Sequence, residues 1–183
     1  MFIIYFSEVS LRITEIKTST MEKLGDYIAI YKEQLDKGDI QKAYTELIKY
    51  VLSLKSHLSK DLSHNFSFGN VSQGYMDYTY FYFFNDFLRE NKLRLGVVLN
   101  HEKIRFELWL LGQNAEVQNT YWDLLKTTKW NKDQSVMPRY SVLEVVLEPN
   151  PDFNNLDVLT AKIEKETIKI SNEIIEYLKS HSL

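Results

Sequence analysis

The stretch from residue 93 to residue 110 constrains the fold more than any other part of the chain. Apolar residues take every second position in two consecutive runs, namely Leu93, Leu95, Val97 and Leu99, then Ile104, Phe106, Leu108 and Leu110. Alternation with a period of two is typical of strands that bury one face. Pairing Leu99 with Ile104 puts both runs on one face of a hairpin, whereas a slip by one residue would send one run to the other face. The sequence therefore predicts an antiparallel hairpin with its turn at residues 100–103.

Helical periodicity precedes this hairpin. Apolar residues recur at spacings of three and four over residues 21–35 and again over residues 40–58. Between the two stretches lies Lys37-Gly38-Asp39, in which a glycine suits the end of one helix and an aspartate the start of the next. So short a link predicts an antiparallel helical hairpin on the N-terminal side.

A long helix is predicted at the C-terminal side, over residues 156–178. Its apolar residues again fall on one face at helical spacing. Lys162 and Glu166, and likewise Lys169 and Glu173, are four residues apart, so each pair is expected to form an ion pair on the exposed side.

The remaining elements complete a mixed fold. Further strands are expected near residues 65–68, over 74–84 and over 140–147, and a short helix capped by Asn114 follows the hairpin. Helices on both sides of consecutive antiparallel strands indicate an α+β domain, with an N-terminal helical hairpin, a sheet of about four to five strands and a long C-terminal helix. The 183 residues fit a single domain, 1–183.

Residues 1–20 allow two interpretations. Val9, Leu11 and Ile13 alternate with polar residues, which predicts an added strand. Alternatively, these residues are a non-native extension, because the Thr18-Ser19-Thr20 cluster before Met21 is a typical helix start. In that case the domain core spans residues 21–183.

Composition excludes several classes of protein. The chain has no cysteine, which excludes disulfides, zinc ribbons, iron–sulfur clusters and cysteine nucleophiles. Its net charge of −3 argues against nucleic-acid binding. The apolar run at residues 2–6 is far shorter than the roughly 18 to 20 residues that span a bilayer, and no later run approaches that length. We expect a cytoplasmic protein with no membrane partner.

Motifs for catalysis and for cofactor binding are missing as well. The sequence has no glycine-rich phosphate loop and no G-x-S-x-G elbow. His57 and His64 lie seven residues apart, and only Asp61 offers a third metal ligand nearby. We therefore expect no metal site and no cofactor.

The second face of the predicted sheet carries the candidate site. Its aromatic and charged positions are Tyr78, Tyr80, Tyr82, Arg94, Arg105, Glu107, Trp109, Tyr140 and Glu144. Rigid rings combined with fixed charges suit a small-molecule pocket or a protein partner, which includes a second copy of the chain. The structural alternative is that a helix, most simply the C-terminal one, covers this face.

Our leading hypothesis is a non-enzymatic binding or interaction domain that uses this face. The alternative is a small-molecule-binding protein or enzyme with a pocket between the sheet and the C-terminal helix. In the enzyme version, Glu107 or Glu144 would serve as acid or base beside Arg94 or Arg105.

Two segments support a resemblance to a known family. Residues 74–81, GYMDYTYF, and residues 105–110, RFELWL, resemble segments of a family of small uncharacterised bacterial proteins of unknown function. The resemblance extends over residues 21–183. It implies no activity for the site residues named above.

Overall fold

The computed structural model describes residues 23–181, and they divide into two compact units that meet between Gln41 and Lys42. Both interpretations of residues 1–20 fall outside the described residues. The first unit contains helix α1 (Leu24–Lys37). Gly38 ends α1 in the left-handed region with φ of 75°, and its backbone N–H donates to the carbonyl of Leu35. The predicted helix with a terminal glycine is thereby confirmed, although no residue of α1 is buried.

The second unit is built around a five-stranded antiparallel sheet with the strand order β1-β2-β3-β4-β5. Its elements are α2 (Asp39–Leu62, which begins before the unit boundary), β1 (Ser67–Ser72), β2 (Tyr78–Phe84), α3 (Asp86–Glu90), β3 (Leu93–Asn100), β4 (Arg105–Gly112), α4 (Ala115–Leu125), β5 (Leu143–Glu148) and α5 (Leu156–Ser180). This order confirms the predicted α+β fold, in which a helix pair precedes the sheet and a long helix follows it.

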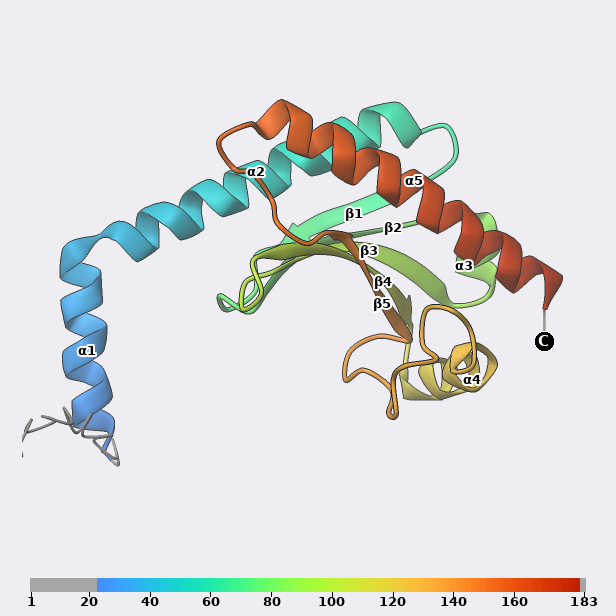
Figure 1. Cartoon of the computed structure of the whole chain (residues 1–183), viewed down its shortest axis with the longest axis horizontal. Helices are drawn as coiled ribbons and strands as arrows, with labels where there is room; N and C mark the ends of the chain where they lie inside the picture. The colour runs from blue at the N-terminus through green and yellow to red at the C-terminus, as the bar shows by residue number, and fades with distance from the viewer. Residues whose placement is uncertain (1–22, 182–183) are drawn as a thin grey trace, which may run out of the picture. The chain divides into compact units, whose positions relative to one another are not determined.

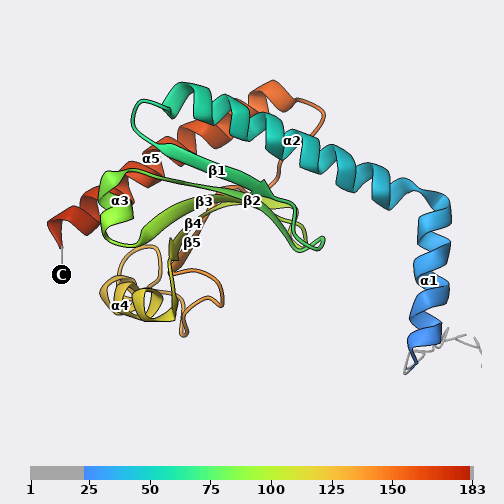
Figure 2. The same ribbon diagram turned by 180° about the vertical axis from the view of Figure 1, so that it is seen from behind.

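Helices α2 and α5 lie on the same face of the sheet, as both views show (Figure 1, Figure 2). The apolar stripes of these helices pack on the aliphatic face of the central strands. Fully or almost fully buried members of this core include Leu54, Leu58, Leu95, Leu99, Phe106, Leu108, Ile163 and Ile174. Burial of so many large side chains is the main stabilising contribution to the second unit.

The register of the β3–β4 hairpin differs from the prediction by two residues. Leu99 pairs with Phe106 rather than with Ile104, and Val97 pairs with Leu108. Ile104 instead closes the turn, where it has φ of 43° and is 44% exposed. A shift by two residues keeps every other apolar residue on the predicted face, because side chains alternate with a period of two. The prediction of which residues face the core is therefore confirmed, whereas the predicted pairing of residues between β3 and β4 was wrong.

Boundaries of the outer elements also differ from the prediction. Strand β1 begins at Ser67, later than expected, and β5 begins at Leu143, so Tyr140 precedes the strand in which it was expected. Helix α3 was not predicted, although Asn85 is a regular N-cap whose side chain accepts a hydrogen bond from the Leu88 N–H. Asn114 caps α4 in the same way, as predicted.

The ion pairs on the exposed side of α5 differ from the predicted ones. Lys162 lies 3.7 Å from Glu148, and Lys169 pairs with Glu166. Glu173 accepts a hydrogen bond from Lys129, in the segment that follows α4. Two of these ion pairs are long-range, because the other strands and loops approach α5 closely enough to compete with its own i,i+4 neighbours. None of the described helices combines the length and the apolar character needed to cross a bilayer.

Candidate functional site

The sheet face opposite α2 and α5 carries a separate aromatic cluster. Val98, Trp109 and Leu111 are buried there, and Tyr78 and Tyr80 pack against them. Strand register brings these residues together, because Tyr80 pairs with Val98 across β2 and β3, while Trp109 follows on β4. The buried residues of α5 belong to the other core, so the C-terminal helix does not cover this face.

A cleft of about 360 Å³ opens over this cluster. It is lined by Gly74, Asp77, Tyr78, Tyr80, Arg94, Val98, Trp109, Leu111 and Tyr140. Its volume lies within the range of pockets that bind small molecules. The Tyr78 ring packs edge to face against two other lining rings. Its centroid lies 4.9 Å from that of Trp109 and 6.2 Å from that of Tyr140.

Glu107 lies beside Trp109, on the same face of β4, and holds its ring in place. Its carboxylate is completely buried, and Oε2 accepts a hydrogen bond of 2.8 Å from the Trp109 indole nitrogen. The other oxygen accepts from Arg105 Nε at 2.5 Å and from Asn100 Nδ2 at 3.4 Å. A buried carboxylate is tolerated only when it is paired and hydrogen-bonded, and these three donors meet that requirement. Glu107 thus fixes the Trp109 ring and is not open to a substrate.

Glu144 lies beside this buried group, on β5 opposite Trp109. Burial raises the pKa of Glu144, and the nearby charge of Glu107 raises it further, whereas a hydrogen bond from Ser141 lowers it. Burial also raises the pKa of Tyr78, with Glu144 as the next cause. Burial is the largest cause of both shifts, as expected for acidic groups that are partly removed from water.

The rim of the cleft is a tight turn between β1 and β2. Gly74 adopts φ of +69°, and a Cβ atom there would lie 2.2 Å from the Tyr78 carbonyl oxygen, so only glycine fits. Asp77 Oδ1 accepts hydrogen bonds from the backbone N–H groups of Tyr75 and Tyr78, which lower the pKa of Asp77. Asp77 therefore stays ionised and keeps the turn in place.

Arg94 supplies the cationic group of the cleft. Its guanidinium lies 4.7 Å from the centroid of the Tyr82 ring, and that ring in turn lies against Gly69. The side chain is exposed on β3, and no carboxylate within the described part of the chain forms an ion pair with it. Arg94 is therefore free to contact an anionic group.

The structure brings the predicted site residues together on one face. Those that line the cleft are Tyr78, Tyr80, Arg94, Trp109 and Tyr140, while those that lie beside the lining residues are Tyr82, Arg105, Glu107 and Glu144. Sequence reasoning missed Gly74, Asp77 and Leu111 as lining residues. Gly74 and Asp77 could have been found from the sequence, because a glycine and an aspartate so close together are typical of a turn.

A larger hollow of about 730 Å³ lies between α2 and the start of α5. Leu47, Tyr50 and Phe153 supply apolar lining, and the charged Glu46 and Lys49 are paired with each other at 2.8 Å. None of the predicted site residues lies there. Ser53, Asp157 and Thr160 add polar groups to its lining.

One group of side chains could hold a metal ion. His57, Asp61 and Glu164 place one ligand atom each within 4.8 Å of one another, on the helices that cover the opposite face of the sheet. From the sequence we considered His57, His64 and Asp61 and expected no metal site. His64 is not part of this group, and Glu164 was not considered because it lies 107 residues from His57 along the chain.

Comparison with known proteins gives one match. The model of a family described as "Domain of unknown function (DUF7000)" matches residues 24–178. The chain belongs to this family. The predicted resemblance to an uncharacterised family is thus confirmed, and the DUF7000 match includes α1 as well as the sheet and α5. Among curated proteins and among solved structures, no match was found.

Proposed function

We propose that the protein is a non-enzymatic binding domain whose ligand occupies the cleft over Trp109. The ligand class is a small molecule with a planar apolar part and an anionic group. The observation that carries this proposal is the cleft itself, in which aromatic rings surround Trp109, whose indole is held by Glu107, and the guanidinium of Arg94 lies at the side.

The planar part follows from the shape and chemistry of the lining. Tyr78, Tyr80 and Trp109 offer ring faces and edges but few hydrogen-bonding groups, because the Trp109 N–H is already bound to Glu107. Such a surface gains most from burying another flat apolar group. Since Glu107 keeps the indole in position before binding, little side-chain entropy remains to be lost.

The anionic part follows from Arg94. A guanidinium without a carboxylate partner binds a carboxylate, sulfonate or phosphate through charge-assisted hydrogen bonds. Asp77, the other charged lining residue, already has its Oδ1 engaged by two backbone N–H groups. Arg94 is therefore the charged lining side chain that we expect to select the ligand.

The test uses 1-anilinonaphthalene-8-sulfonate, a fluorescent probe with a planar apolar part and one sulfonate. We expect the native protein to enhance its fluorescence with a saturable dependence on concentration. Arg94→Gln should weaken the apparent affinity by about tenfold or more, as expected for the loss of a charge-assisted contact. Tyr140→Ser, which removes a half-exposed ring from the lining, should weaken it as well.

Arg89→Gln is the matched control, because Arg89 is an exposed arginine of α3 outside the cleft and pairs with Asp86. Equal binding by the Arg94 and Arg89 variants would contradict the proposal. Native mass spectrometry of the freshly purified protein adds a second readout. A bound mass that is lost on denaturation supports a small ligand, whereas a mass of twice the chain would assign the face to a homodimer instead.

A further inference from the structure

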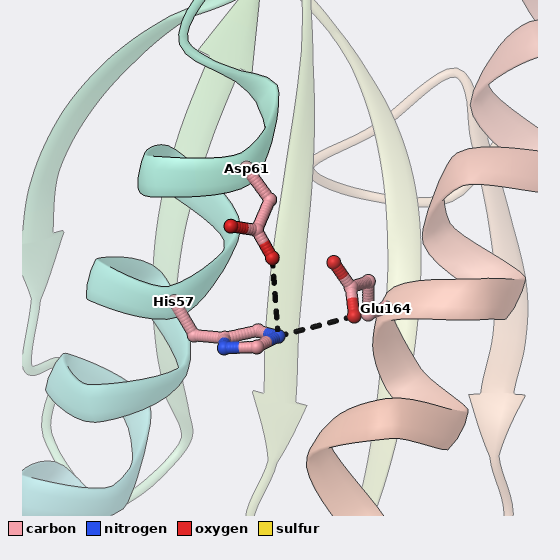
Figure 3. A group of neighbouring side chains, drawn as sticks. All are labelled: His57, Asp61 and Glu164. Carbon is pink, nitrogen blue, oxygen red and sulfur yellow. Dashed lines mark hydrogen bonds and ion pairs between the residues drawn. The ribbon is translucent and has the colours of Figure 1, made fainter.

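Figure 3 shows three side chains that converge between α2 and α5, on the side of the sheet away from the cleft. His57 Nε2 lies 3.1 Å from Glu164 Oε2 and 3.7 Å from Asp61 Oδ2. All three ligand atoms lie within 4.8 Å of one another. One imidazole nitrogen and two carboxylate oxygens therefore surround a common point.

These separations fit a small divalent cation. Zinc binds nitrogen and oxygen ligands at about 2.0–2.2 Å in tetrahedral geometry, which places neighbouring ligand atoms roughly 3.3 Å apart. The two distances from Nε2 lie on either side of that value. The third pair of ligand atoms, the oxygens of Asp61 and Glu164, lies within 4.8 Å, a separation that flexible carboxylate side chains can adjust on binding.

The backbone that carries these residues is fixed by the core. His57 and Asp61 are four residues apart on α2, a spacing that puts both side chains on one face of a helix. Leu58, next to His57, and Ile163, next to Glu164, are completely buried. Both helices are thus anchored immediately beside the ligands, which preorganises the site.

Charge and ligand type select the metal. Two carboxylates balance the charge of a divalent ion, and the imidazole favours zinc over magnesium and calcium, which prefer oxygen ligands alone. The side chains of His57, Asp61 and Glu164 are 43%, 47% and 22% exposed, so an ion can enter from solvent and keep water in its remaining positions.

We infer that His57, Asp61 and Glu164 form a zinc site that clamps α2 to α5. The ion replaces the direct contacts of His57 with Asp61 and Glu164 by coordinate bonds, which join both helices. Because both helices cover the apolar core, zinc binding raises the stability of the second unit. This site is independent of the ligand proposed for the cleft.

Isothermal titration of the full chain, freed of any histidine tag and treated with EDTA, tests this inference with zinc chloride as the probe. We expect one zinc ion per chain and a rise of several degrees in the thermal midpoint. Magnesium chloride should produce neither effect. Bound Co²⁺ should show the visible absorption of a tetrahedral site, which a merely structural ion pair would not produce.

Four variants decide which residues bind the ion. His57→Ala should abolish binding, and Asp61→Asn and Glu164→Gln, which keep the side-chain size, should each weaken it by about tenfold or more. His64→Ala is the matched control, because His64 is an exposed histidine just beyond the end of the same helix. The inference is overturned if the wild type binds no zinc, or if His57→Ala and Glu164→Gln bind it as well as His64→Ala does.

Discussion

Glu107 is the buried charge that organises the aromatic face. It is 0% exposed, and its two oxygens accept hydrogen bonds from Trp109, Arg105 and Asn100. The sequence predicted Glu107 as a site residue because it alternates with the apolar positions of its strand. Because both of its oxygens already accept hydrogen bonds within the protein, Glu107 holds Trp109 in place and does not bind a ligand.

Replacing Glu107 by Gln should destabilise the fold by about 2–4 kcal/mol. The new amide NH₂ would face a donor, either the Trp109 indole or the Arg105 guanidinium, and the arginine would lose its counter-charge. Urea unfolding monitored by tryptophan fluorescence measures the loss. Glu102→Gln, in the exposed turn of the β3–β4 hairpin, is the control and should change stability little. A loss in Glu107→Gln no larger than that in Glu102→Gln would show that the buried network contributes little.

At the scale of elements, His101 joins two turns to a helix. The Thr79 hydroxyl has one hydrogen and donates it to the Gln73 carbonyl, so His101 Nε2 donates to Thr79 Oγ1 at 2.8 Å. Tyr44 of α2 donates to the same Gln73 carbonyl, and its ring lies 5.6 Å from the His101 ring. The β1–β2 turn at the cleft rim is therefore held to the β3–β4 turn and to α2 by neutral hydrogen bonds.

Acidification should weaken this junction. Burial lowers the pKa of His101 below its ordinary value of 6.5, and the charge of Asp77 only partly offsets that effect. The unfolded chain consequently takes up the proton more readily than the folded chain does. The stabilising contribution is present above pH 6.5 and is lost as the pH falls toward the folded-state pKa.

Urea unfolding at pH 7.5 and at pH 5.5 checks this prediction. His101→Gln keeps a donor near the Nε2 position but does not titrate, so it should lose less stability between these pH values than the wild type. His64→Gln changes an exposed histidine and should follow the wild type. Identical pH dependence in all three proteins would contradict a role for His101.

At the scale of the whole molecule, the two compact units contribute unequally to the core. No residue of α1 is buried, whereas α5 buries Leu159, Ile163, Ile170, Ile174, Ile175 and Leu178. Each of these side chains contributes roughly 1.5–3 kcal/mol by burial. Together they match or exceed the ordinary stability of a whole domain, about 5–15 kcal/mol.

A chain shortened to begin at Gly38 should therefore still unfold cooperatively, with a thermal midpoint within about 4 °C of the full chain. A chain that ends at Asn155 lacks α5 and should not fold. Thermal unfolding followed by circular dichroism compares the two. Loss of the cooperative transition on removal of α1 alone would mean that the second unit depends on the first.

The sequence by itself determined the types and order of the main elements, with the exception of the short helix α3, and the two faces of the central strands. These properties are local, because periodicities of 2 and 3.6 residues assign each side chain to a face before any partner is known. The same patterns predicted the aromatic and charged residues that the structure gathers on one face, from Tyr78 on β2 to Trp109 on β4.

Only the tertiary structure decided the rest, since each remaining feature depends on groups far apart in the chain. The two-residue change of register preserves the apolar pattern, so alternation alone could not distinguish Phe106 from Ile104 as the partner of Leu99. Packing of α5 on the aliphatic face leaves the cleft over Trp109 uncovered. It also brings Glu164 to His57 across 107 residues, an approach that only the docking of two helices on one sheet produces.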